Sequence, residues 1–233
     1  MDLLIPLSNK STWSDNELRY ALRSVESNLQ GIDTVWTIGH KPEWLINTTH
    51  ILLGEATKTN SDANIIAKVE YLCKQPGLSD NFIRMSDDQL VLKFLKASEI
   101  PIYHVGKGKS GSTTWYKRLQ NTLKALDHLD PRNYDSHYPM IYNKKDFIKS
   151  IKGFKYWTNP GYTINSLYFN QVLVERKRLP IGYRTHIRKP LSIKEIEAIS
   201  QDSYFLCYND SGLNESMKML IECIFPNPSG FEK

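Results

Sequence analysis

The sequence predicts an α/β fold, built on a mostly parallel sheet flanked by helices, with a more helical C-terminal half. Short apolar runs such as 3–7 recur through the first ninety residues, and amphipathic helical patterns separate them. Parallel strands that are buried on both faces have this continuous apolar character, and helices form the crossovers between them. Beyond residue 92 the strand pattern becomes irregular and helical spacing dominates.

The N-terminal part follows the order strand, helix, strand, strand, helix, strand. We expect its strands at 3–7, 34–39, 50–53 and 82–85. Ser14 and Glu17 have the spacing of a capping box, which opens a helix that ends at Gly31. Apolar residues at helical spacing predict a second helix from about 60 to 74.

The C-terminal part is expected to be mainly helical. The segment 105–113 is rich in glycine and lysine, but Ser112 stands where a phosphate-binding P-loop requires lysine. We interpret this segment as a mobile lid or an acceptor loop. Helices are expected over 115–126, 144–151, 163–174 and 214–224, and a strand over 204–208.

Positive charge is concentrated in the middle of the chain. Residues 1–92 carry 8 Lys and Arg against 12 Asp and Glu, residues 93–189 carry 19 against 6, and residues 190–233 carry 3 against 7. The middle stretch therefore has a net charge of +13. Its segment 175–189 mixes arginine with aromatic residues, which favours contact with a polyanion such as nucleic acid. A lysine-rich solvated surface is the alternative.

Length and cysteine content indicate a protein with a sizeable core in a reducing compartment. The 233 residues suffice for one large domain, or for one domain with a small appendage. Cys73, Cys207 and Cys223 form no CxxC pair, so we interpret them as small hydrophobic residues. No apolar run reaches the roughly 18 residues that span a bilayer, and residues 1–7 lack a basic signal-peptide start. We expect a cytoplasmic protein without membrane contact.

Two adjacent carboxylates, Asp87 and Asp88, follow the apolar run 82–85. Neighbouring carboxylates repel each other, and burying them is costly unless a cation compensates their charge. Mg²⁺ and Mn²⁺ prefer carboxylate oxygens and substrate phosphates, and ligands of open α/β sheets lie outside the carboxyl ends of the strands. We therefore predict a divalent metal held by Asp87 and Asp88. The alternative is that they cap a helix that begins near Gln89.

Several blocks of the chain resemble, in order, the Stealth family of sugar-phosphate transferases and related bacteriophage glycosyltransferases. The blocks are 16–26 (NELRYALRSVE), 41–45 (KPEWL), 76–83 (PGLSDNFI) with 86–88 (SDD), 135–139 (DSHYP) and 209–210 (ND). The match is good over the first two-fifths of the chain and weak in the middle. The chain departs from the family pattern at 5–10 (IPLSNK) and at Ser86, which replaces an asparagine.

The resemblance implies a GT-A-like fold that binds a nucleotide-diphosphate sugar, with Mn²⁺ or Mg²⁺ as cofactor. Asp88 is then the direct metal contact and a catalytic residue, and Asp87 is the second metal ligand. The resemblance does not decide which group is transferred. Either a sugar or a sugar phosphate could move from the nucleotide at such a site.

Six further residues are expected to bind the donor: Arg19, Arg23, Leu7, Ser8, Lys68 and Asn209. Arg19 and Arg23 lie one helical turn apart and can neutralise the diphosphate, because arginine forks match phosphate oxygens. The alternative for them is an ion pair with a glutamate of the same helix. Leu7 and Ser8 end the first strand and begin a loop that can touch the base or ribose, and Lys68 is a candidate phosphate contact.

On the acceptor side, His137 is a candidate general base, because the pKa of histidine lies near neutrality. A structural histidine is the alternative. Asn209 and Asp210 are expected to close the site as hydrogen-bond partner, catalytic residue or extra metal ligand, although Asn-Asp-Ser-Gly is also typical of a turn. Tyr156 and Trp157 can stack on a base or sugar, or pack in the core.

These expectations describe a metal-dependent glycosyltransferase. Residues 1–92 form its nucleotide-sugar-binding half, and residues 93–233 form a basic acceptor-binding and closing half of one compact domain. The charge of residues 93–189 favours double-stranded DNA as acceptor, through a hydroxymethylated pyrimidine of bacteriophage DNA flipped out of the stack. Two alternatives are a sugar-phosphate transferase acting on a glycan and a non-catalytic polyanion-binding module.

Overall fold

The computed structural model describes residues 1–108, 111–172 and 174–233, and its centre is a five-stranded sheet. The strand order is β4-β3-β1-β5-β9. The strands are β1 (Asp2–Leu7), β3 (Val35–Gly39), β4 (Thr49–Ile51), β5 (Asn81–Arg84) and β9 (Met140–Asn143). The first four strands of this order are mutually parallel, and the edge strand β9 runs antiparallel to β5. The predicted mostly parallel sheet is therefore confirmed.

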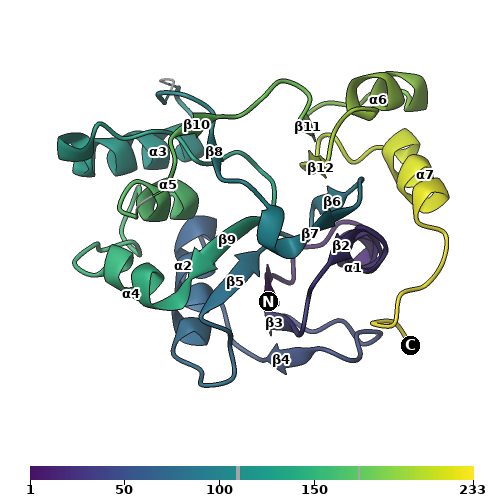
Figure 1. Ribbon diagram of the computed structural model, residues 1–233, viewed down its shortest axis with the longest axis horizontal. Helices are drawn as coiled ribbons and strands as arrows, with labels where there is room; N and C mark the ends of the chain where they lie inside the picture. The colour runs from purple at the N-terminus through teal and green to yellow at the C-terminus, as the bar shows by residue number, and fades with distance from the viewer. Residues whose placement is uncertain (109–110, 173) are drawn as a thin grey trace.

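Helices surround this sheet on both sides (Figure 1). They are α1 (Asn16–Asn28), α2 (Ser61–Cys73), α3 (Thr114–Ala125), α4 (Lys144–Ile151), α5 (Ile164–Phe169), α6 (Ile193–Ser200) and α7 (Glu215–Ile224). Figure 1 shows α2 to α5 grouped on one side, with α1, α6 and α7 on the other. The predicted helix 163–174 is shorter in the structure, and its residue 173 lies outside the described residues, as do 109 and 110 of the predicted loop. In the described ranges, no helix has the length and apolar character needed to cross a membrane.

A smaller three-stranded sheet joins the middle of the chain to its C-terminal part. It has the order β11-β12-β6 and consists of β11 (Arg184–Ile187), β12 (Phe205–Tyr208) and β6 (Gln89–Val91). Because β6 begins at Gln89, the alternative in which Asp87 and Asp88 cap a helix is wrong. Two further pairs are short: β2 (Leu29–Gln30) with β7 (Leu95–Lys96), and β8 (Tyr103–His104) with β10 (Lys177–Arg178). Single 3₁₀ turns span Ala97–Glu99 and Asp127–Leu129.

The core forms around β1, whose apolar side chains explain its central place. Leu3, Leu4 and Ile5 are fully buried between β3 and β5. The expected apolar stripe of α1, which includes Leu18 and Leu22, is buried in the same cluster. Parallel strands have helices on both faces, so a strand at the centre of such a sheet has no solvent face to fill with polar residues.

The start of α1 differs from the predicted capping box. The helix begins at Asn16, and Ser14 and Asp15 before it have positive φ angles of 54° and 59°. Ser11 takes the place of the expected cap: its Oγ accepts from the Asp15 N–H (2.7 Å) and donates to Glu17 Oε2 (2.6 Å). The capping-box prediction was therefore wrong, because Ser11, and not Ser14, forms the hydrogen bond with the Glu17 side chain.

The carboxyl ends of β1 and β3 approach each other closely at Gly39. Its φ is +116°, and a Cβ there would overlap the Leu7 carbonyl oxygen and lie 2.9 Å from Lys68 Nζ. We expect Gly39→Ala to lower the free energy of unfolding by about 2–3 kcal/mol, measured by urea denaturation. Gly54→Ala is the matched control, because nothing lies within 4 Å of a Cβ added there. Equal effects of the two substitutions would contradict this prediction.

Candidate active site

Asp87 and Asp88 lie in the turn between β5 and β6, at the carboxyl edge of the parallel strands. Backbone bonds hold the turn: Gln89 N donates to Ser86 O (3.3 Å), and Tyr208 N donates to Asp88 O (3.3 Å). The Gln89 side chain also accepts from the Ser86 N–H (3.1 Å). Strand β12 thus fixes the backbone of the turn from the other sheet, at the edge where open α/β sheets bind ligands.

Both carboxylates of this turn are half-buried and short of positive charge. Burial and the nearby Glu17 raise the pKa of Asp87 to about 6. Burial and Asp87 raise the pKa of Asp88 to about 7, although Arg84 opposes the shift. In the part of the chain that the structure describes, no lysine, arginine or histidine forms an ion pair with either carboxylate. The pair therefore carries negative charge that the protein leaves uncompensated.

The two carboxylates are of the ligand type that divalent cations such as Mg²⁺ and Mn²⁺ prefer. The described residues contain no group of three or more His, Cys, Asp or Glu side chains arranged to hold a metal. The protein thus offers two carboxylate ligands, and substrate phosphate and water would complete the coordination. Mg²⁺ and Mn²⁺ are commonly bound in this way, by one or two carboxylates together with phosphate oxygens.

A hollow of about 140 Å³ lies where β1 ends, and we call it the β1 hollow. Its lining includes Leu7, Ser8, Lys68 and Asp87, which brings three predicted donor-binding residues to one aspartate of the pair. Lys68 is buried, and its Nζ donates to Leu7 O (2.5 Å) and to Glu55 Oε1 (2.6 Å). These bonds use two of its three donors. Lys68 therefore holds the end of β1 and has one N–H left for a ligand.

A second hollow, of about 330 Å³, lies beside Asp88, and we call it the central hollow. It brings Asp88 and His137 together, although they lie far apart in the sequence. The other charged residues of its lining are Asp62, Arg84, Arg118 and Asp135. The β1 hollow and the central hollow share Ser61, Ile65, Arg84 and Ser86, so they are adjacent, and each contains one aspartate of the turn.

His137 is a poor candidate for the general base, although it lines the central hollow. Burial, the adjacent ring of His186 at 4.2 Å between centroids, and Arg184 and Arg188 hold its pKa well below the ordinary value. The imidazole is therefore neutral near pH 7 and binds protons weakly. Its catalytic role stays a prediction, but one that its electrostatic surroundings do not favour.

Arg84 forms the wall common to both hollows. Its side chain is 6% exposed; Nη1 donates to Asn165 Oδ1 (3.1 Å) and Nη2 donates to Ser86 Oγ (3.0 Å). Its Nε is buried without a hydrogen-bond partner among the described residues. Arg84 lowers the pKa of Asp88 without forming an ion pair with it. Arg84 therefore adds a positive charge to the wall that the two hollows share, and this charge offsets that of Asp88 only in part.

Arg19 and Arg23 face the segment 225–233 instead of the aspartate turn. Glu232 accepts from Arg19 Nη1 (2.8 Å), Arg23 Nε (2.7 Å) and Arg23 Nη2 (2.8 Å). Arg23 also donates to Phe225 O (3.0 Å), and the Arg19 guanidinium stacks on Trp44. Neither arginine lines the β1 hollow or the central hollow. We therefore do not retain them as diphosphate ligands, and their acidic partner is not a glutamate of their own helix.

Asn209 and Asp210 form an exposed turn after β12. Asn209 Oδ1 accepts from the Gly212 N–H (2.9 Å), as expected of a turn. Asp210 contributes to the raised pKa of Asp88, so its charge lies within electrostatic range of the pair. Neither residue lines the two hollows. The turn alternative describes Asn209 well, and the roles of Asn209 and Asp210 in binding or catalysis stay predictions.

Trp157 and Tyr156 have separate roles in the structure. Trp157 is 59% exposed and lines a hollow of about 310 Å³ that shares Arg118 with the central hollow. Tyr156 donates its hydroxyl to Glu70 Oε2 (2.6 Å). An aromatic face is thus available beside the central hollow, while its neighbour ties the loop to α2.

The arrangement of strands and helices matches those of solved glycosyltransferases. No family profile and no curated sequence matches the chain. The galactosyltransferase LgtC, solved with donor and acceptor sugar analogues, is similar with a TM-score of 0.55 at 10% identity, over 96% of this chain and 95% of LgtC. The bifunctional glycosyltransferase WbbM is similar with a TM-score of 0.54 at 10% identity, over 98% of this chain and 50% of WbbM. This chain has a GT-A-type fold.

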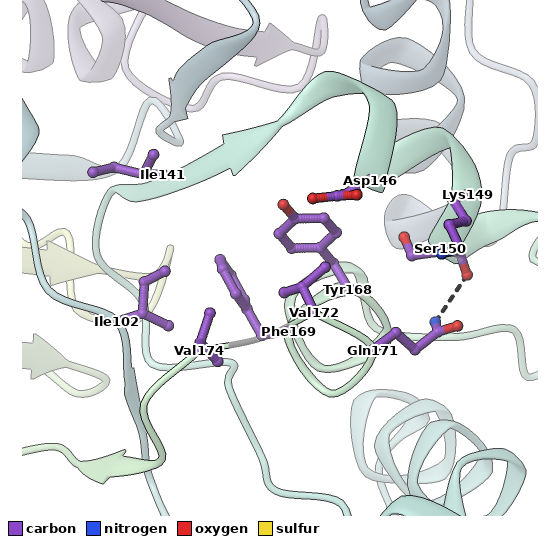
Figure 2. Close-up of a pocket in the computed structure, with 10 residues that line it drawn as sticks. All are labelled: Ile102, Ile141, Asp146, Lys149, Ser150, Tyr168, Phe169, Gln171, Val172 and Val174. Atoms are coloured by element: carbon purple, nitrogen blue, oxygen red, sulfur yellow. Dashed lines mark hydrogen bonds between the residues drawn. The ribbon is translucent and has the colours of Figure 1, made fainter.

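The expected GT-A-like fold is therefore confirmed, and at these identities the likeness extends to the fold alone. In this GT-A fold a separate hollow of about 380 Å³ lies between β9, α4 and α5 (Figure 2). Its wall mixes apolar and polar side chains, and its charged residues are Asp146 and Lys149. It shares no lining residue with the β1 hollow or the central hollow, and it has one carboxylate in place of a pair.

The basic middle part of the GT-A fold uses some of its charge internally. Arg118 pairs with Asp62 (2.8 Å), and Arg132 pairs with Asp130 (2.7 Å). Other basic side chains of this stretch are exposed, among them Lys117, Lys124, Lys152, Lys155, Arg188 and Lys189. The structure thus supplies surface charge for a polyanion, but contact with DNA stays a prediction.

Sequence patterns did not identify Arg84 or Asp135 as site residues. Arg84 was hidden inside an apolar strand, where a lone arginine is itself a signal, because a buried charge needs a reason. Asp135 opens the block that contains His137, and only the fold shows that both line the central hollow.

Proposed function

We propose that this chain is a metal-dependent glycosyltransferase that moves a sugar from a nucleotide-diphosphate sugar to an acceptor hydroxyl. One observation carries the proposal: an uncompensated pair of aspartates sits between two hollows at the carboxyl edge of a GT-A-type sheet. A structural carboxylate pair would normally be neutralised by a neighbouring cation. A pair left without one, in a concave site, is typical of a functional position.

The nucleotide is assigned to the β1 hollow and the transferred sugar to the central hollow. Leu7 and Ser8 would contact the nucleoside, and the remaining N–H of Lys68 would bind a phosphate oxygen. Asp87 and Asp88 would hold Mn²⁺ or Mg²⁺, which supplies positive charge to the departing diphosphate. Arg84 lines both hollows and would add a positive charge beside the diphosphate.

The reaction exchanges one bond at the anomeric carbon of the donor sugar. The acceptor oxygen forms a bond to this carbon as the bond to the diphosphate oxygen breaks, and a nucleoside diphosphate leaves. The exposed face of Trp157 beside the central hollow suits the approach of an acceptor, because rings of this kind stack on sugars and bases. The net charge of +13 over residues 93–189 supports a polyanionic acceptor, for which we propose hydroxymethylated DNA.

The test uses the purified protein, stripped with EDTA and then supplied with Mn²⁺. A panel of UDP-glucose, UDP-galactose, UDP-N-acetylglucosamine and GDP-mannose is offered with hydroxymethylated or unmodified duplex DNA. Ion-exchange chromatography identifies the released nucleotide, and mass spectrometry of digested nucleosides reports any added sugar. We expect nucleoside diphosphate in the presence of Mn²⁺ and its loss when EDTA is present.

Other results would select the alternatives. Release of nucleoside monophosphate would identify sugar-phosphate transfer instead. DNA binding without turnover of any donor would indicate a polyanion-binding module. Release of nucleoside diphosphate with no sugar added to the DNA, together with a DNA affinity that does not fall with salt, would reject DNA as the acceptor. The proposed sugar transfer would then stand with a different acceptor.

A further inference from the structure

Asp135 occupies a rigid place on the wall of the central hollow. It lies in the segment between α3 and β9 and is 9% exposed. Its own N–H donates to Asn133 Oδ1 (2.9 Å), and Tyr134 N donates to Ser166 Oγ (3.0 Å). This short segment is thus tied to itself and to α5, which fixes the direction of the Asp135 side chain.

The Asp135 carboxylate has one oxygen held and the other open. Ser166 Oγ accepts from Tyr134 N and donates its proton to Asp135 Oδ2 (2.5 Å). The Thr163 hydroxyl lies near enough to Asp135 to lower its pKa but forms no hydrogen bond of normal geometry with it. Within the described ranges, no hydrogen bond is donated to Asp135 Oδ1, and no basic side chain lies within ion-pair distance. A carboxylate that lines a hollow and is oriented by one hydrogen bond is well placed to take a proton from a bound hydroxyl.

The other acid–base groups of the central hollow are less suited to this task. Asp62 Oδ2 is paired with Arg118 Nη1 (2.8 Å), so a cation already compensates the charge of this carboxylate. His137 binds protons weakly for the reasons given above. Asp88 belongs to the turn that would hold the metal. Asp135 is the one carboxylate described in this lining that combines a fixed orientation with freedom from both a metal and an arginine.

We infer that Asp135 is the general base of the reaction, taking the proton of the acceptor hydroxyl through its Oδ1. The inference rests on the proposed function and names a catalytic residue for it. As the acceptor oxygen forms its bond to the anomeric carbon, its proton passes to Asp135, and the bonding pair of the departing C–O bond leaves with the nucleoside diphosphate. The acceptor oxygen attacks the face of the carbon opposite the departing diphosphate, and this single displacement inverts the configuration of the sugar.

The electrostatic surroundings of Asp135 agree with this role. Burial raises its pKa to about 6, and Asp62 on α2 adds to the shift. The Ser166 hydrogen bond on α5 and the charge of Arg84 on β5 act in the opposite direction. A base with a pKa slightly below neutrality is ionised at pH 7 and still accepts a proton readily.

The experiment compares the wild-type protein with Asp135→Asn, Asp135→Glu and Asp146→Asn. Asp146 is the matched control, because it lines the separate hollow of Figure 2. Each protein receives the donor panel and Mn²⁺ with water as acceptor, and separately with sodium azide, which attacks carbon without losing a proton. We expect Asp135→Asn to lower kcat for hydrolysis by about 10²–10⁴-fold, with KM for the donor changed less than about threefold.

The azide reaction distinguishes a general base from a structural residue, because azide carries no proton for a base to remove. We expect Asp135→Asn to form glycosyl azide at a rate near wild type, Asp135→Glu to retain more hydrolysis than Asp135→Asn, and Asp146→Asn to behave as wild type. Unchanged hydrolysis by Asp135→Asn would overturn the inference, as would an equal loss of both reactions in a variant that melts like wild type. A sugar covalently attached to Asp135, or retained configuration in the product, would also overturn it. Absence of turnover in the wild-type protein would instead reject the proposed function.

Discussion

Asp88→Asn is expected to abolish sugar transfer while making the metal-free protein more stable. The substitution keeps the shape of the side chain and removes one of the two charges that would hold the metal. We expect turnover of the nucleotide sugar to fall by about 10²–10³-fold or more, as for the loss of a preorganised electrostatic contact in other enzymes. The gain in stability follows from the pKa of the pair.

Folding raises the pKa of Asp88 to about 7, mainly through burial and the charge of Asp87. A carboxyl group with a higher pKa in the folded than in the unfolded protein binds its proton more tightly when folded. It therefore favours folding at low pH, and this advantage is lost as the pH rises through about 7. At about pH 8 the wild-type protein must bury the charged Asp88 carboxylate, whereas Asp88→Asn has no charge there. We therefore expect the free energy of unfolding of the variant to exceed that of wild type by on the order of 1–2 kcal/mol. Below about pH 4 the two proteins should be equal.

Thermal unfolding at both pH values, with EDTA and with Mn²⁺, measures these effects. Mn²⁺ should stabilise the wild-type protein at about pH 8 by mass action and should have little effect on Asp88→Asn. Asp202→Asn is the matched control, because Asp202 is an exposed surface residue. Wild-type turnover by Asp88→Asn would remove the basis of the proposed function. A variant less stable than wild type at about pH 8 would contradict the account of the uncompensated pair.

The sequence predicted the central sheet well, because its strands have a strong local pattern. β1 and β3 are mostly apolar and buried, and β5 contributes the fully buried pair Phe82 and Ile83, as expected of parallel strands. Strand β9 was missed, because MIYN at the sheet edge alternates between buried and half-buried positions and is only four residues long. Strands β6 and β11 were missed for a related reason: their pairing with β12 depends on residues far away in the chain.

The candidate site was also predictable only where its residues form a local sequence pattern. The aspartate turn was predictable, because two acids at the end of an apolar strand form a local signal. Arg19 and Arg23 also carry a local signal, one helical turn apart, but this spacing says only that they share a face. Their partner Glu232 lies 213 and 209 positions away, and only the folded chain shows which charge the arginines meet. Asp135 was overlooked for the same reason, since Ser166 orients it from another helix.

Glu232→Gln is expected to cause the largest loss of stability among the substitutions considered. The Glu232 side chain is 1% exposed and receives hydrogen bonds from Arg19, Arg23 and both the N–H and hydroxyl of Ser229. The substitution leaves the buried guanidinium of Arg23 without a counterion. Removing one partner of a buried ion pair costs about 3–5 kcal/mol, because the remaining charge is neither solvated nor paired. For a chain of this size we expect the melting temperature to fall by roughly 10 °C.

The pH dependence of this effect has the opposite sign to that of Asp88. Hydrogen bonds from Arg23 and Ser229 outweigh burial and lower the pKa of Glu232 to about 2. A carboxyl group with a lower pKa in the folded protein stabilises folding above its unfolded pKa, and this contribution is lost as the pH falls toward 2. The difference between wild type and Glu232→Gln should therefore stay constant from about pH 8 to about pH 5 and shrink below that.

Urea denaturation across this pH range measures the difference, and Glu197→Gln on the exposed face of α6 is the matched control. Because Arg19 and Arg23 are held by Glu232 and line neither hollow, the folded variant should also bind Mn²⁺ and nucleotide as wild type does. A loss of donor binding in folded Glu232→Gln would restore the two arginines as diphosphate ligands. A stability equal to that of Glu197→Gln would show that segment 225–233 is detached in solution. If the segment is bound, removing the Glu232 charge leaves Arg23 buried without a counterion, and this must lower the stability.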